Sequence, residues 1–171
     1  TATKTRSFRR PVRPPGSILL ALALMLTGAS VHPKLQVASG GIARCVIVTQ
    51  PGATPAERYA AQELAATLKQ ITGAPFVTKE LTDDAPESAI VVGAGPLTAR
   101  FFPEVDLATF GGEEYIIRTQ GGRLLLAGGR PRGTLYAVYR FLQDQLGVRY
   151  YAPWFTHYPD RAVLTLGSLN V

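Results

Sequence analysis

The stretch that decides the fold reads EYIIRTQGGRLLLAGGRPRGTLYAVYRFLQDQLG and covers residues 114–147. Within it, residues 114–119 and 123–127 are strand-like runs joined by a Gln-Gly-Gly turn, a pattern typical of an antiparallel hairpin. A glycine-rich loop at residues 128–133 then leads into a segment whose apolar side chains recur at helical spacing. This apolar stripe consists of Leu135, Val138, Tyr139, Leu142 and Leu146, and Gly147 follows as a stop signal. The stretch therefore predicts two paired strands followed by a helix.

A second helix is predicted upstream, at residues 54–72. Thr54 offers an N-cap oxygen, Pro55 suits the first helical position, and Glu57 completes a capping box. Gly73 marks the end of this helix. Its apolar residues again fall on a single face, so we expect that face to pack inward.

Short strand patterns flank the two helices at residues 43–49, 76–81, 89–92, 148–151 and 161–166. Two helices that each carry one apolar stripe need only one face of a sheet to bury them. The hairpin at residues 114–127 makes that sheet at least partly antiparallel. We therefore expect an α+β fold, a two-layer sandwich in which two helices pack on one face of a mixed, mostly antiparallel sheet.

The basic charge of the chain is concentrated at its start. The 171 residues include 18 Lys and Arg against 12 Asp and Glu, a formal net charge of +6. Residues 1–39 hold the whole excess, because they contain six basic residues and no acid. The remainder is balanced, so we expect no nucleic-acid partner.

This basic start precedes an apolar run at residues 18–26 and small residues at 27–30, the pattern of a secretory signal peptide. The run is about half the ~20 residues that a membrane-spanning helix needs. We expect a signal peptide at residues 1–30, a linker at 31–42 and an α+β domain at 43–171. The protein would then be exported to the periplasm or the exterior, with no membrane attachment after cleavage.

The polar motifs offer little catalytic chemistry. The 128–133 loop lacks the P-loop and dinucleotide-binding spacings, and Pro131 removes one amide, but Arg130 and Arg132 stay as candidate contact residues. Adjacent carboxylates on a strand, such as Glu113 and Glu114, point to opposite faces and would not flank one glycosidic bond. One cysteine, Cys45, is expected to be a buried inert thiol. We expect no catalytic residue, metal or cofactor.

The densest aromatic cluster is YYAPWFTHY at residues 150–158. Aromatic rings of this kind stack on sugars, cover a sheet edge or fill interfaces between domains. Trp154, Tyr151 and His157 are therefore the main candidates for contact with a substrate oligosaccharide or another domain.

Three segments together resemble a known family. They are PAERYAAQELAATLKQITGA (55–74), IVVGAGP (90–96) and YIIRTQGGRLLLAGGRPRGTLYAVYRFLQDQLGVRYYAP (115–153). This pattern resembles the N-terminal domain of family 67 α-glucuronidases and related glycoside-hydrolase-like proteins, and part of it is similar to the second domain of β-hexosaminidases. The resemblance covers about residues 43–166. It implies an accessory domain packed beside a catalytic (β/α)8 barrel, with the catalytic carboxylates on the barrel.

The resemblance implies a non-catalytic accessory domain of an exported, α-glucuronidase-like glycoside hydrolase of xylan breakdown, with the barrel absent from this chain. Two alternatives stay open. One is a free-standing carbohydrate-binding module, and the other is a stand-alone glycoside hydrolase.

Overall fold

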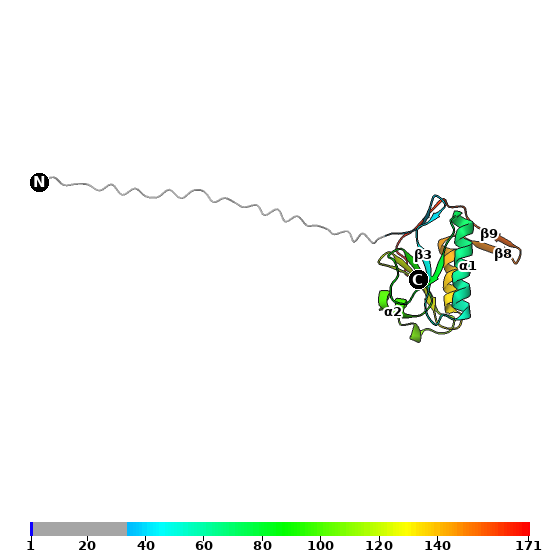
Figure 1. The fold of residues 1–171 in the computed structure, drawn as a ribbon, viewed down its shortest axis with the longest axis horizontal. Helices are drawn as coiled ribbons and strands as arrows, with labels where there is room; N and C mark the ends of the chain where they lie inside the picture. The colour runs from blue at the N-terminus through cyan, green and yellow to red at the C-terminus, as the bar shows by residue number, and fades with distance from the viewer. Residues whose placement is uncertain (2–33) are drawn as a thin grey trace. The chain divides into compact units, whose positions relative to one another are not determined.

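The computed structural model describes Thr1 and residues 34–171 (Figure 1). The expected signal peptide and the first part of the expected linker lie outside the described residues, apart from Thr1. In residues 34–171, no helix combines the length and the apolar character that crossing a membrane requires.

The centre of the fold is a five-stranded sheet in the order β4-β3-β5-β7-β6. Its strands are β3 (Val46–Thr49), β4 (Thr78–Glu80), β5 (Ala89–Val92), β6 (Tyr115–Gln120) and β7 (Arg123–Gly128). The β3–β4, β3–β5 and β5–β7 pairs are parallel, whereas β6 and β7 form the predicted antiparallel hairpin. All four residues of β5 are buried, because this strand has neighbours on both edges and is covered on both faces.

Both predicted helices are confirmed and pack on one face of this sheet. Helix α1 (Pro55–Thr72) has the complete capping box between Thr54 and Glu57, and Gly73 ends it with a φ of 70°. Helix α3 (Gly133–Arg140) continues as a π-helical segment, η2 (Phe141–Gln145). Figure 1 shows α1 and α3 side by side. Their apolar stripes form the larger core with residues that include Ile47, Ile90, Leu124 and Leu126.

The opposite face of the sheet is covered by the segment that follows β5. This segment contains helix α2 (Pro96–Phe101) and the 3-10 turn η1 (Leu107–Thr109). Leu97 and Phe102 are fully buried there against Val48, Val91 and Leu125 of the sheet. Both faces of the sheet are therefore packed.

The linker predicted at residues 31–42 is wrong for residues 35–42, which belong to two paired strands and the turn between them. The strands are β1 (Leu35–Ser39) and β2 (Ile42–Ala43), and β1 also pairs with β10 (Val163–Leu166) in a three-stranded sheet. Gly40 and Gly41 have positive φ and make the turn between β1 and β2. Val37 is fully buried in the larger core, so the domain begins before residue 43.

A further hairpin extends the strand predicted at residues 148–151 by a turn and a second strand. It consists of β8 (Arg149–Ala152) and β9 (Phe155–His157), joined by a turn at Pro153 and Trp154. Figure 1 shows this hairpin extending past α1. We call it the aromatic hairpin.

The α+β class is confirmed, and antiparallel pairing predominates over the structure as a whole. The antiparallel pairs are β1–β10, β1–β2, β6–β7 and β8–β9. The parallel pairs all lie in the central sheet. This distribution follows from chain connectivity, since a parallel pair needs a long crossover and β3 is connected to β4 through α1.

The assignment of residues 35–39 to the core can be tested with Val37→Ala. This change removes two methyl groups from a side chain that is 0% exposed, so we expect the free energy of unfolding to fall by about 1–3 kcal/mol. Urea denaturation of the full chain measures it. Gln36→Ala is the matched control, since Gln36 is exposed on the same strand and should change stability by less than about 0.5 kcal/mol. Equal, negligible effects of the two changes would show that this strand is not part of the core.

Candidate functional site

The glycine-rich loop at residues 128–133 packs directly onto the backbone of residues 111–114, a contact that we call the glycine corner. A Cβ atom on Gly129 would clash with the carbonyl oxygen of Gly111, and one on Gly133 would clash with the carbonyl oxygen of Glu114. Only glycine permits this approach of two backbone segments.

The amides of the glycine corner already have acceptors. Gly129 N–H donates to the Glu114 carbonyl at 2.9 Å, and Arg132 N–H donates to the Gly112 carbonyl at 3.2 Å. Gly133 N–H donates to the Gly129 carbonyl at 2.8 Å. The glycines therefore serve close packing, and these amides are not free to cradle an anion.

Arg130 extends from the glycine corner to Glu57 of α1. Its guanidinium lies 3.1 Å from Oε2 and 3.3 Å from Oε1 of Glu57, and it also donates to the Gly52 carbonyl at 3.1 Å. The Glu57 carboxylate further accepts the backbone N–H groups of Thr54 and Ala94, and the residue is 1% exposed. Arg130 thus holds the domain's own elements together.

These contacts set the ionisation of Glu57. Burial alone would raise the pKa of its carboxyl group. The hydrogen bonds from Thr54, Arg130 and Ala94 and the positive charge of Arg130 outweigh burial, so the pKa lies below its ordinary value of 4.5. A carboxylate held ionised in this way is unsuited to be the general acid of a glycosidase, whose pKa must be raised.

Beside Glu57, the carboxyl-end edge of the parallel strands is filled by the buried side chain of Gln50. Its amide nitrogen donates to the Gly93 carbonyl and to the Thr98 hydroxyl, both at 2.8 Å. Its amide oxygen accepts the N–H groups of Leu97 and Thr98. Ligands of open α/β sheets commonly bind at this edge. Here the Gln50 side chain is committed to hydrogen bonds within the domain, although a pocket of about 340 Å³ remains between Ala94, Gly128 and Arg130.

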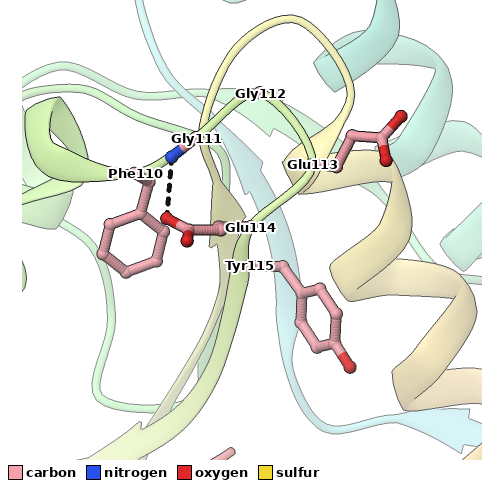
Figure 2. Close-up of a pocket in the computed structure, with 6 residues that line it drawn as sticks. All are labelled: Phe110, Gly111, Gly112, Glu113, Glu114 and Tyr115. Atoms are coloured by element: carbon pink, nitrogen blue, oxygen red, sulfur yellow. Dashed lines mark hydrogen bonds between the residues drawn. The ribbon is translucent and has the colours of Figure 1, made fainter.

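An open pocket of about 740 Å³ borders the glycine corner and is lined by residues 110–115 (Figure 2). Figure 2 shows the two neighbouring carboxylates directed to opposite sides of this segment. Glu114 accepts the Gly111 N–H at 2.7 Å, whereas exposed Glu113 lies 3.8 Å from Arg132. Arg132 is itself exposed, so this predicted contact residue remains accessible to a partner.

The aromatic hairpin carries the other predicted contact residues on an exposed surface. Trp154 is 87% exposed at the turn, and Tyr151 and Phe155 are 66% and 56% exposed. The rings of Tyr151 and Phe155 are stacked, with centroids 5.6 Å apart. Exposed His157 ends β9 on the same hairpin. Clustered exposed aromatic rings of this kind mark a surface that contacts a ligand or partner.

One aromatic ring anchors the hairpin to the helical layer. Tyr150 meets Tyr139 of α3 edge to face, with centroids 5.5 Å apart. Burial, with the negative charge of Glu63 nearby, raises the pKa of Tyr150 to about 12, so its hydroxyl stays neutral at physiological pH. The structure thus gathers Tyr151, Trp154 and His157 on one hairpin, while Arg130 and Arg132 belong to the glycine corner.

A second group of aromatic residues was not recognised as a site in the sequence. Tyr115, Tyr136, Tyr139, Arg140 and Gln143 line a pocket of about 450 Å³ beside α3. Residues 136, 139, 140 and 143 follow helical spacing and form a second stripe on α3 and η2. This stripe shares Tyr139 with the apolar stripe that was recognised in the sequence. That spacing was the signal available, although Tyr115 comes from β6 and could be added only from the structure.

In the described part of the chain, neither Cys45 nor any cluster of side chains able to ligate a metal forms a further candidate site. The Cys45 thiol is partly buried and faces the Val37 carbonyl at 3.7 Å, and burial raises its pKa to about 12, which suits an inert thiol. In residues 34–171, His, Cys, Asp and Glu form no group that could hold a metal ion.

The glycine corner predicts a large effect of Gly129→Ala. The added methyl group would force the two backbone segments apart, so we expect the free energy of unfolding to fall by about 3 kcal/mol. Gly167→Ala is the matched control, because a Cβ there meets nothing within 4 Å. Urea denaturation of both variants measures the difference. A Gly129→Ala variant as stable as the control would refute the packing role of this glycine.

Glu57 predicts a defined pH dependence of stability. Because its folded-state pKa is depressed, the ionised carboxylate stabilises the fold above about pH 4.5, and this contribution is lost as the pH falls through the folded-state value. We expect Glu57→Gln to cost about 1–3 kcal/mol at pH 7 and clearly less at pH 3. Urea denaturation at both pH values provides the measurement, with Glu113→Gln as the exposed control. A cost independent of pH would contradict this assignment.

The comparison with known protein families matches the central part of this fold. A family model described as "Glycosyl hydrolase family 67 N-terminus" matches residues 39–141. The match contains all five strands of the central sheet, α1, α3 and the glycine corner, whereas the aromatic hairpin and β10 follow it in the chain. No curated protein matches the chain.

Proposed function

Because the chain belongs to the glycosyl hydrolase family 67 N-terminus family, we propose that this accessory domain of a glycoside hydrolase is non-catalytic and supports a (β/α)8 barrel in the same parent protein. The parent enzyme would be exported and α-glucuronidase-like, and would act in xylan breakdown. The observation that carries the proposal is the family match, which spans the whole central sheet and both large helices.

The chemistry of the glycine corner supports a scaffold role. Arg130 of this corner is tied to the buried carboxylate of Glu57 in α1, which also accepts two backbone amides and has a lowered pKa. The neighbouring amide of Gln50 is committed to four hydrogen bonds. These groups position α1, α2 and the strand ends relative to one another, and they have little freedom left to act on a substrate.

The aromatic hairpin is the surface that we assign to contact with the barrel. Interface cores are rich in Trp, Tyr and Phe, and a few such residues supply most of the binding energy. Trp154, Tyr151 and Phe155 expose their rings together, and the segment 150–156 contains no charged residue. A partner with an apolar depression would bury these rings without desolvating a charge.

Export of the parent enzyme is the part of the proposal that depends on residues 1–30. Their support is the sequence pattern alone, a basic start followed by an apolar run and small residues. A polysaccharide such as xylan is too large to enter a cell intact, and an exported enzyme would meet it outside.

The proposal predicts that the gene of the parent protein encodes a barrel of roughly 250 residues, and that the full chain binds that barrel when the two are produced separately. Trp154→Ala should weaken this binding by about 2 kcal/mol, roughly thirtyfold, because the ring is lost from the centre of the contact. Calorimetric titration measures the affinity. Folding should be unaffected, since Trp154 is 87% exposed.

Val77→Ala is the control for this titration, because Val77 is a similarly exposed apolar residue, next to β4. A gene without a barrel would overturn the accessory function itself. Normal binding by Trp154→Ala would overturn only the role of the aromatic hairpin.

A further inference from the structure

The pocket beside α3, which we call the tyrosine pocket, has the dimensions of a small-ligand site. Its volume of about 450 Å³ lies within the roughly 300–1,000 Å³ that is usual for such sites. Three tyrosine rings line it, two from α3 and one from the start of β6. Elements from two layers of the fold therefore form its walls.

Each of the three rings makes a different contact within the domain. Tyr115 packs against the larger core. The Tyr136 hydroxyl donates to Oε1 of Glu113 at 3.4 Å. Tyr139 meets the ring of Tyr150 edge to face. Ring faces that are fixed before binding reduce the entropy that a ligand must pay.

Polar groups accompany the rings, and the arginines at or near the pocket have carboxylate partners. Arg140 and Gln143 line the wall and supply guanidinium and amide donors. The charge of Arg140 is balanced by Asp144 at 3.9 Å, and that of nearby Arg132 by Glu113 at 3.8 Å. This balance favours a neutral ligand that combines apolar faces with many hydroxyl groups.

We propose that the tyrosine pocket binds a neutral pyranose oligosaccharide. The C–H face of a pyranose ring stacks on a tyrosine face, and its hydroxyl groups bond to amide, guanidinium and phenol groups. The choice of a carbohydrate as the ligand class rests on the proposed function, because the family match is to a glycosyl hydrolase N-terminus. It adds to that function a sugar-binding site on the accessory domain, separate from the aromatic hairpin.

The test is calorimetric titration of the full chain with xylohexaose, cellohexaose and mannohexaose. We expect saturable binding of at least one of them. Tyr136→Ala should lower its association constant about tenfold, because one stacking face is lost. Tyr136→Phe keeps the ring and should stay within about threefold of the unaltered chain.

Two further variants separate this site from the hairpin and from a folding defect. Gln143→Ala should also weaken sugar binding, while Trp154→Ala should leave it unchanged. The urea midpoint of each variant shows whether it is folded. If Tyr136→Ala is destabilised, sugar binding by Gln143→Ala and Tyr136→Phe shows whether the pocket is the binding site.

The inference is overturned if none of the three hexasaccharides binds, if binding depends on Trp154 and not on the pocket residues, or if a proline-rich decapeptide binds the pocket more tightly than any sugar. Failure here is distinguishable from failure of the proposed function. Tyr136→Ala should bind the catalytic barrel like the unaltered chain, so absent sugar binding with intact barrel binding refutes only the pocket.

Discussion

The fold depends on the close approach of two backbone segments at the glycine corner. Glu114 comes directly before β6, Gly129 directly follows β7, and Gly133 begins α3, so one contact joins an edge hairpin to a helix. Any side chain at Gly129 or Gly133 would separate these segments. From the same corner, Arg130 contacts the buried carboxylate of Glu57 and so connects the β6–β7 hairpin to α1. The ion pair gains strength because the carboxylate is shielded from water and also accepts backbone hydrogen bonds.

This packing determines where function can reside. The carboxyl ends of β3, β5 and β7 meet at an edge that many α/β proteins use for ligands. Here the buried side chains of Gln50 and Glu57 are committed to hydrogen bonds within the domain. Exposed groups that are free of these contacts include the rings of the aromatic hairpin and the lining of the tyrosine pocket. Both connect to α3 through Tyr139, which contacts Tyr150 of the hairpin and lines the pocket. A domain organised in this way is suited to support and recognition.

The sequence predicts those features whose determinants are local. The capping box of Thr54 and Glu57 and the stop at Gly73 define α1 within a few residues of each end. By contrast, β1 was missed, because its local partner β2 has only two residues and its longer partner β10 lies more than a hundred residues away, with Leu35 opposite Leu166. Of the candidate contact residues, Trp154 and Tyr151 were predicted from composition, and the structure shows them exposed, whereas neither the Glu57–Arg130 pair nor the tyrosine pocket was predicted. Each of these forms between elements distant in sequence, so only the fold brings its members together.

The amides of the glycine corner are committed to packing within the domain, and we propose the aromatic hairpin as its outward contact. Hydrogen exchange of the full chain, alone and mixed with the parent's catalytic barrel, tests both statements in one experiment. We expect slow exchange at the amides of Gly129 and Gly133 in both samples. We also expect exchange in β8 and β9 to slow when the barrel is added. Unchanged exchange in the aromatic hairpin, with new protection appearing at the glycine corner, would contradict both statements.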